Sequence, residues 1–523
     1  MDTVFLWVIV WVFSVATLAL AVYGLHLYLL VFLFIRRRGD RRRRHGEIIE
    51  AYHRERPSGD WPVVTSQIPL YNESNVAERV LRAVAAMDYP AGKHEIQVLD
   101  DSADETRALV DRIAERLRAA GADIQIVRRS CREGYKAGAL ANGLNTARGT
   151  YVAVFDADFV PPPDFLRKAV PLIESAPDLA CVQGRWDHLN REESWLTRAQ
   201  ALGIDGHFAI EQGARAWNGL MMNFNGTAGV WRRAAIEDPR VGHWTGDTLT
   251  EDLDLSYRAQ LAGWRLEYCL DLACPAELPG SVDALKSQQR RWATGSIQVA
   301  RKLLPRIWGA PCSLGQKLEA TLHLTHYSVA LWMLLLALIA RPMIMVIADG
   351  RLFSSDWFWM AWAVILLSAI APSLTYAYAR YSLSGRWSGL KIIPSMMVLG
   401  CGLCLNNALG VVRGLHLRGG EFVRTPKSGS EHRARRPSSY QAVQNHLWIL
   451  EIVLGVYSFA SFLFYFRYLH RAFSVFLLLY AIGFCVIGWA SRPRRPAPSI
   501  RAPREATPLF ASGVQPLDST TGG

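Results

Sequence analysis

Long apolar segments limit this chain of 523 residues to folds that place part of it in a membrane. The first segment, Val4 to Ile35, is longer than the about 20 residues that a crossing helix needs. It therefore predicts one crossing with a tilt or an extension beyond the bilayer. The start, Met1-Asp2, has no basic residue and the apolar run is too long for a cleaved signal peptide. The arginines between Arg36 and Arg44 mark its C-terminal end as cytosolic.

Five further apolar segments follow in the second half of the chain. They are about His323 to Ala348, Trp357 to Tyr378, Ile392 to Val412, Leu447 to Phe466 and Phe473 to Ala490. The third, Ile392 to Val412, has basic loops on both sides, so both its ends are expected in the cytosol. A single helix length cannot cross twice, and we therefore expect this segment to be interfacial or re-entrant. That leaves five spans, with the N-terminus outside and the C-terminus inside.

The stretch from Trp61 to about Arg301 predicts a soluble α/β domain. Expected strands are Pro62 to Ile68, Glu95 to Leu99, Ile124 to Val127 and Thr150 to Phe155, with helices at Glu73 to Met87 and Glu105 to Ala120. Apolar strands that alternate with amphipathic helices indicate a doubly wound, mostly parallel sheet. Ligands gather at the carboxyl ends of such strands.

These patterns divide the chain into six parts. We expect an N-terminal transmembrane helix with a basic cytosolic flank (1–45), a cytosolic domain (61–301), interfacial and transmembrane helices (302–412), a cytosolic loop segment (413–446), a transmembrane hairpin (447–490) and a disordered cytosolic tail (491–523).

Charge and cysteine usage argue against a nucleic-acid-binding protein and against a protein held together by disulfide bonds or a cysteine metal site. The net charge is +12, but the basic clusters sit at membrane edges without interleaved aromatic residues, which argues against nucleic-acid binding. The 8 cysteines follow no regular framework, and those in the cytosolic domain are expected to be reduced, packed thiols. Cys401-x-x-Cys404 lies in an apolar segment with no second pair, so packed thiols are favoured over a metal site there as well.

Five polar clusters occur in one order between the membrane segments. They are Gln67 to Glu73, Asp100-Asp101-Ser102, Asp156-Ala-Asp158, Thr250-Glu251-Asp252 and Gln288-x-x-Arg291-Trp292. In series they indicate the transfer of a sugar from a nucleotide to a growing chain.

The first two carboxylate pairs follow predicted strands directly. A nucleotide-sugar diphosphate would be repelled by Asp156 and Asp158 unless a divalent cation, Mg²⁺ or Mn²⁺, lay between them. The alternative is an ordinary turn with an aspartate as helix cap. Asp100 and Asp101 could likewise cap the next helix, although their number favours hydrogen bonds to a base or ribose. Lys136 near a helix N-terminus could meet the diphosphate, or be a solvated surface lysine.

Asp252 is the candidate for the catalytic base, because a sugar hydroxyl attacks well only when its proton is removed. One carboxylate suffices for a single displacement, which inverts the anomeric centre. Glu251 and Asp254 compete for the role, and flanking leucines could desolvate Asp252 and raise its pKa. Otherwise the cluster is an acidic helix N-terminus capped by Thr248 or Thr250.

The cluster Gln288 to Trp292 contains a cationic side chain, Arg291, next to an aromatic one, Trp292. Arg291 can give bidentate contact to phosphate oxygens, and Trp292 can stack on the apolar face of a sugar ring. The alternative is an amphipathic surface helix with a tryptophan at the membrane interface.

From about Trp61 to Lys427 the chain resembles the membrane-embedded family 2 glycosyltransferases, the cellulose-synthase superfamily. Four stretches look most like its cellulose-synthase-like A branch, which makes β-1,4-mannan and glucomannan: Gln67 to Glu73, Phe155 to Phe159, Asn223 to Trp231, and Gln288-Gln289.

The resemblance implies roles for the matching positions. Asp252 would be the catalytic base, and Asp156 and Asp158 would serve the metal. The implied donor-binding residues are Pro69, Tyr71, Glu73, Asp100, Asp101, Lys136, Asp156, Asp158 and Arg291. Those implied for the acceptor are Asn225, Gly226, Thr227, Glu251, Gln288 and Trp292. Phe422, Thr425 and Lys427 look like a gating loop, with Arg424 where those enzymes often have valine.

The function expected is a processive, inverting glycosyltransferase that polymerises a β-linked polysaccharide and passes it across the membrane. GDP-mannose and UDP-glucose both fit as donors, and the branch favours mannose over cellulose or another β-glucan. Its partners would be the donor, the growing polysaccharide, the bilayer and accessory export proteins, in a bacterial inner membrane. One alternative is a non-processive enzyme that adds a sugar to a lipid. Another is a transporter or receptor with an inactive cytosolic domain.

Overall fold

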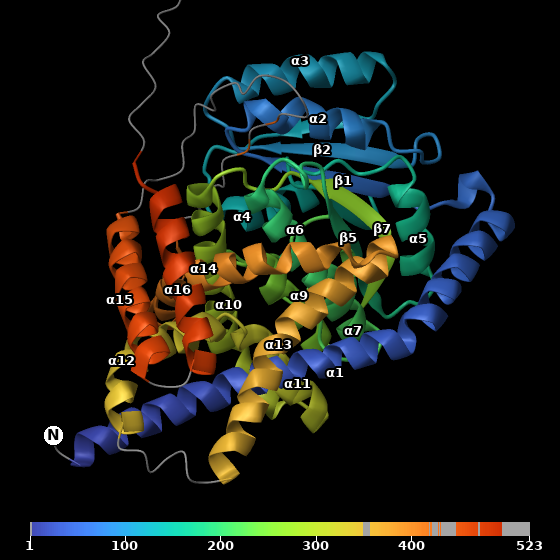
Figure 1. The fold of residues 1–523 in the computed structure, drawn as a ribbon. Helices are drawn as coiled ribbons and strands as arrows, with labels where there is room; N and C mark the ends of the chain where they lie inside the picture. The colour runs from blue at the N-terminus through green and yellow to red at the C-terminus, as the bar shows by residue number, and fades with distance from the viewer. Residues whose placement is uncertain are drawn as a thin grey trace, which may run out of the picture.

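The computed structural model describes residues 3–348, 356–417, 419–420, 427, 429, 446–468 and 471–493. A sheet with helices on both faces forms the upper part of the molecule, and a group of apolar helices lies below and beside it (Figure 1). The predicted gating residues Phe422 and Thr425, and the predicted tail from residue 494 onward, lie outside the described residues.

The sheet has seven strands in the order β3-β2-β1-β4-β6-β5-β7. Their bounds are β1 (Val64–Leu70), β2 (His94–Asp100), β3 (Ile124–Val127), β4 (Tyr151–Val154), β5 (Leu179–His188), β6 (Gly229–Arg232) and β7 (Arg265–Ala276). Strands β1 to β4 pair in parallel, as does β5 with β7, whereas β6 runs antiparallel to both β4 and β5. The predicted doubly wound, mostly parallel sheet is confirmed.

Amphipathic helices cover the sheet because their apolar stripes need burial. The helices α2 (Ser74–Ala85) and α3 (Thr106–Ala119) lie above it in Figure 1, where the sequence predicts helices. Others are α4 (Tyr135–Leu144), α5 (Phe165–Glu174), α6 (Trp195–Gly206), α7 (Gln212–Ala216), α8 (Arg233–Ile236) and α9 (Glu251–Leu261). Buried side chains form two large apolar clusters, as expected for a sheet that is buried on both faces.

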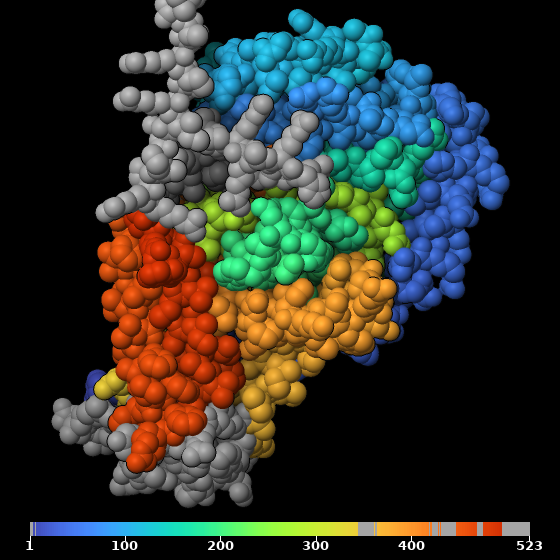
Figure 2. Space-filling model, turned by 45° about the horizontal axis from the view of Figure 1, so that its top comes forward, coloured from blue at the N-terminus to red at the C-terminus, as the bar shows by residue number. Residues whose placement is uncertain are grey.

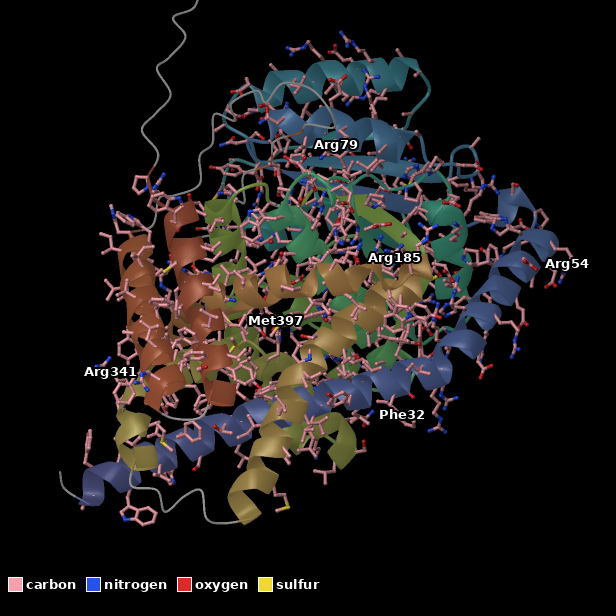
Figure 3. All side chains as sticks on the ribbon, viewed as in Figure 1. Phe32, Arg54, Arg79, Arg185, Arg341 and Met397 are labelled. Atoms are coloured by element: carbon pink, nitrogen blue, oxygen red, sulfur yellow. The ribbon has the colours of Figure 1, made fainter. Side chains whose placement is uncertain are left out.

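The first helix, α1 (Thr3–Glu55), joins an apolar segment long enough to span a membrane to a basic extension without a break. Apolar residues of its first part, Phe32 among them, are exposed, as a lipid-facing surface would be, and Arg54 lies near the other end (Figure 3). The extension is attached to the sheet domain by a bidentate ion pair, in which Arg42 donates to Asp271 at 2.7 and 2.8 Å.

Within the part of the chain that the structure describes, four helices are long and apolar enough to cross a membrane: Trp7–Glu55, Ala363–Ser384, Ile393–His416 and Leu447–Arg467. A fifth span is possible if α11 (Leu314–Thr325) and α12 (Ser328–Ala348), bent by 62° at their junction, count as one. The remaining apolar helix, α16 (Arg471–Ala490), is shorter in its apolar part. The segment that we expected to be interfacial or re-entrant forms α14 (Ile393–His416), one unbroken helix with the length and composition of a span.

Helix α10 (Val282–Gly309) connects the sheet domain to the apolar helices. It packs against α9, α11 and α14. Its Lys286 forms a buried ion pair at 2.8 Å with Glu451 of α15 (Leu447–Tyr468), and Lys286 also donates to Ser491 beyond α16. The hairpin α15–α16 forms a column along one side of the molecule in Figure 2, where it packs on α14, and α13 (Asp356–Ser384) lies against α1. Since a buried charge is tolerated only with its partner, the pair fixes the hairpin to α10.

Candidate active site

One open pocket collects most of the residues predicted for the site. It lies at the carboxyl ends of β1, β2 and β4, beside the first turns of α4 and α9, and is closed on another side by α10. The predicted residues that line it are Pro69, Tyr71, Glu73, Asp101, Lys136, Asp156, Asp158, Asn225, Gly226, Glu251, Asp252, Gln288, Arg291, Trp292 and Lys427. Five clusters far apart in the sequence therefore face one space.

Two predicted residues lie beside the pocket without lining it. The carboxylate of Asp100 is fully buried and accepts a hydrogen bond from Arg128 at 2.8 Å. The hydroxyl of Thr227 is also buried, and it accepts a hydrogen bond from the backbone N–H of Asp156 at 2.9 Å. Both support the backbone that carries the pocket residues. Successive residues of a strand point to opposite sides, so Asp101 alone of its pair faces the pocket.

Each carboxylate of the Asp156-x-Asp158 pair is held by a lysine. Lys136 Nζ lies 2.5 Å from Asp156 Oδ1, and Lys427 Nζ lies 2.5 Å from Asp158 Oδ2. Lys427 also donates to the backbone carbonyl of Glu277 at 2.8 Å. Positive charge therefore already occupies this end of the pocket, beside the two carboxylates.

Lys136 lies at the centre of the site. Besides Asp156 it donates to the backbone carbonyl of Gly226 at 2.8 Å and lies 3.9 Å from Glu251. Gly226 has a φ of +81°, and a Cβ at this position would lie 2.9 Å from Asp252 and 3.2 Å from the lysine nitrogen. Glycine is required here because the backbone passes so close to these groups.

Of the three acidic candidates at the start of α9, one is suited to take a proton. The carboxylate of Asp254 is fully buried and bonded to Arg258 and Lys302, so it is a structural group. Burial, and then the negative charge of Glu251, raises the pKa of Asp252 to about 7. The threonine before the helix, Thr250, makes no side-chain capping hydrogen bond.

The ends of β1 and β2 form a second polar wall. The carboxylate of Asp101 accepts two hydrogen bonds from Arg129, at 2.8 and 2.6 Å. The guanidinium of Arg132 lies 3.3 Å from the ring centre of Tyr71, and both residues line the pocket. A planar base or a phosphate would find an aromatic face, a cation and a fixed carboxylate here.

The third wall is made by α10, from which Gln288, Arg291 and Trp292 reach the pocket. The charges of Glu251, Asp156, Asp252 and Asp158 all act on Arg291. The ring of Trp292 lies 6.4 Å from that of Trp186, at the end of β5. Trp186, whose β5 neighbour Arg185 is labelled in Figure 3, packs in turn on Phe208 at 4.8 Å.

Sequence reasoning missed several pocket residues. Trp186, Asp187 and His188 line it from the end of β5, and Arg132 lines it as well. The mixed polar and aromatic sequence of β5 shows no alternation typical of a strand, so the strand was not predicted. Had it been predicted, the polar and aromatic residues at its end would have been candidates for the site.

Comparisons with known proteins find related glycosyltransferase sequences. The family model described as "Glycosyltransferase like family 2" matches residues 62–295. Glucomannan 4-beta-mannosyltransferase 7 of Arabidopsis thaliana is 32% identical over 444 residues, which cover 83% of this chain and 77% of that protein. Glucomannan 4-beta-mannosyltransferase 1 of Cyamopsis tetragonoloba is 32% identical over 449 residues, covering 83% and 82%. Among solved structures, mannosyltransferase PcManGT from Pyrobaculum calidifontis, in complex with GDP-Man and Mn²⁺, is similar over 70% of this chain and 99% of that chain. Its identity is 20% and the TM-score is 0.44.

Proposed function

Because this chain belongs to the family 2 glycosyltransferases, as a relative of the glucomannan 4-beta-mannosyltransferases, we propose that it polymerises a β-1,4-linked, mannose-containing polysaccharide. The observation that carries the proposal is the convergence of Asp101, Asp158, Asp252 and Trp292 on one pocket beside apolar helices. The chain is a membrane protein and a hexosyltransferase. GDP-mannose is the proposed donor, because the names of its relatives specify mannose transfer.

The nucleoside would lie between the ends of β1 and β2, where Tyr71 and Asp101 line the pocket. The diphosphate would then reach the lysine-rich centre. Lys136 and Arg291 face this position, and cations fixed in a partly buried site bind phosphate oxygens strongly. Glu73 and Pro69 complete the nucleoside wall.

A divalent cation fits the chemistry of Asp156 and Asp158. Mg²⁺ usually takes one or two carboxylates and completes its shell with substrate phosphates and water. Among the described residues, no group of three or more His, Cys, Asp or Glu side chains is arranged to hold a metal alone. A cation that binds together with the donor diphosphate agrees with both facts. When bound, it would neutralise charge on the leaving diphosphate.

Asp252 is the proposed base, which takes the proton of the acceptor hydroxyl as that oxygen attacks the anomeric carbon. The C–O bond to the diphosphate breaks as the new glycosidic bond forms, so the configuration inverts. Trp292 would stack on the acceptor sugar, with Gln288, Asn225 and Gly226 beside it. Glu251 keeps Lys136 in place and raises the pKa of the base.

The pH dependence of turnover should report Asp252. A base works only when deprotonated, so the rate should fall as pH drops below the pKa of about 7. We expect kcat/KM for the acceptor, at saturating donor, to fall about tenfold per pH unit below the pKa. Initial rates between pH 5 and 9 measure this. An acid limb near pH 4, where an ordinary aspartate titrates, would contradict the assignment.

Substitution of Trp292 should change the length of the product. Trp292→Ala removes the stacking surface, worth about 0.5–1.5 kcal/mol for an aromatic contact, so the acceptor should leave sooner. We expect shorter chains, or none, with donor affinity retained. Gel separation of labelled products measures the length, and Trp308→Ala, a distant exposed tryptophan, is the control. Unchanged product length would exclude a stacking role.

The proposed function is tested by incubating purified protein in lipid nanodiscs with each radiolabelled donor and Mg²⁺. Digestion of the product with linkage-specific hydrolases then identifies the polymer. A β-1,4-mannan from GDP-mannose supports the proposal, whereas a single glycolipid band would favour the non-processive enzyme.

The two glucomannan 4-beta-mannosyltransferases named above come from plants, so they give no support to the predicted bacterial membrane.

A further inference from the structure

A chain of buried and partly buried polar contacts joins the first membrane helix to the acceptor side of the pocket. It consists of His26, Glu319, Arg215, Glu211 and His207, here called the relay, and it ends on Asn225. Glu319 pairs with His26 of α1 and with Arg215 of α7, the latter at 2.7 Å. Arg215 also donates to Glu211 at 3.0 Å. None of these five side chains has a role in the chemistry proposed above.

The far end of the relay fixes the amide of Asn225. Glu211 Oε2 lies 3.3 Å from His207 Nδ1, and His207 Nε2 lies 3.2 Å from Asn225 Nδ2. Gln212 donates to the amide oxygen of Asn225 at 2.6 Å, which makes the amide nitrogen the donor towards His207. In this arrangement His207 Nε2 accepts from the amide of Asn225, and His207 Nδ1 donates to Glu211. An asparagine amide has two donor protons and two acceptor lone pairs, so one of each is left for the hydroxyls of a sugar in the pocket.

The local backbone is unusual at the same place. His207 to Glu211 form a single π-helical turn between α6 and α7. Such turns are uncommon and are found frequently at functional sites. The turn is also pressed against a membrane helix, because a Cβ on Gly206 would lie 2.6 Å from the ring of Tyr376 on α13. This turn therefore connects the pocket wall with the apolar helices.

Stability alone does not explain the relay. The side chains of Arg215, Glu319 and His26 are 3%, 5% and 10% exposed. Buried ion pairs give little or no net stability over apolar residues of the same volume, since desolvation offsets their attraction. What such a network does supply is one fixed arrangement of its members.

We propose that the relay positions Asn225 for the acceptor sugar and ties this contact to the first membrane helix. His207 and Glu211 are positioning residues, since they act on the sugar only through Asn225. The inference rests on the proposed function, because it assigns Asn225 to a β-linked hexose acceptor. Glu319 lies one helical turn before His323, which bonds the hydroxyl of Tyr257 on α9 at 2.7 Å. The helix α11 thus also contacts α9, which carries the proposed base in its first turn.

The test compares Glu211→Gln and His207→Ala with the conservative His207→Gln, in full-length protein in nanodiscs. We expect KM for a β-1,4-linked manno-oligosaccharide to rise about tenfold in the first two, a loss of one hydrogen bond's worth of affinity, and products to shorten. His207→Gln should recover most of the acceptor binding, because an amide can replace the imidazole nitrogen. The dissociation constant of GDP-mannose should stay within about twofold in all three.

Glu237→Gln is the matched control. Glu237 pairs with Arg233 at 2.7 Å with the same four-residue spacing as Glu211 and Arg215, but it does not line the pocket. Thermal unfolding of each variant shows whether the fold is kept. Unchanged acceptor KM and product length in folded Glu211→Gln and His207→Ala would overturn the inference. An equal loss of donor affinity would also overturn it, since the relay would then support the pocket as a whole.

Calorimetric binding of the oligosaccharide separates this inference from the proposed function. A wild type that transfers no sugar but binds the oligosaccharide, more weakly after His207→Ala, would refute the proposed function and leave the inference standing. Transfer by the wild type with equal oligosaccharide binding in all variants would do the reverse. A wild type that neither transfers nor binds would refute both.

Discussion

Asp252→Asn is expected to abolish sugar transfer while the protein still binds its donor. Loss of a general base costs about 100- to 10,000-fold in rate, and asparagine keeps the size of the side chain but cannot take a proton. The dissociation constant of the nucleotide sugar should stay within about twofold, because the base acts on the acceptor hydroxyl. Nucleotide release by the purified enzyme measures the first quantity, and equilibrium binding of labelled GDP-mannose measures the second.

The matched control for this variant is Asp178→Asn, at an exposed position where the carboxylate pairs with Arg265 outside the pocket. Its turnover should equal that of the wild type. If Asp252→Asn lost donor affinity in proportion to its rate, the carboxylate would be a donor ligand and Glu251 would become the candidate base. Retained turnover in Asp252→Asn would remove the assignment of Asp252 as the base.

Asp158→Asn is expected to fail at an earlier step, because the donor itself should bind poorly. If the carboxylate holds a cation that bridges to the diphosphate, its loss should weaken binding of GDP-mannose in the presence of Mn²⁺ by at least about 100-fold. The variant also frees Lys427, which lies 2.5 Å from this carboxylate. Binding is measured with and without Mn²⁺ in the variant, in the wild type and in Asp178→Asn.

A chelator gives an independent form of the same experiment. Removal of divalent cations should stop turnover of the wild type, and Mg²⁺ or Mn²⁺ should restore it. In Asp158→Asn neither cation should increase donor affinity. Metal-dependent binding that survives in this variant would show that the cation is held elsewhere, and Asp158 would then serve the sugar or Lys427 alone.

The sequence predicts the strands that are buried and rich in β-branched residues. Strands β1, β2 and β4 are buried along almost their whole length, whereas β3, at the edge of the sheet, is buried only at Ile124. The sequence does not predict β6, which has four residues and runs antiparallel, or β5, whose second half is polar because it ends in the pocket. Polar function at the end of a strand thus removes the pattern by which the strand is recognised.

The same limit applies to the site. The motifs predict which residues meet, because carboxylates after successive parallel strands reach one edge of the sheet. They do not tell Asp101 from Asp100, since the side that a strand residue faces depends on the register of the sheet. No sequence pattern predicts the relay. His26, Arg215 and Glu319 are isolated polar residues in three different helices, and only the packing of those helices brings them together.

The central claim is that one nucleotide sugar lies between these distant carboxylates, with its anomeric carbon beside Asp252. The most direct measurement is an experimental structure of Asp252→Asn with GDP-mannose and Mn²⁺, since this variant should bind the donor without consuming it. The account predicts an anomalous manganese peak between Asp158 and the diphosphate, with Lys136 and Arg291 on the phosphates. A donor bound away from Asp158, or with its sugar turned away from residue 252 and Trp292, would contradict it.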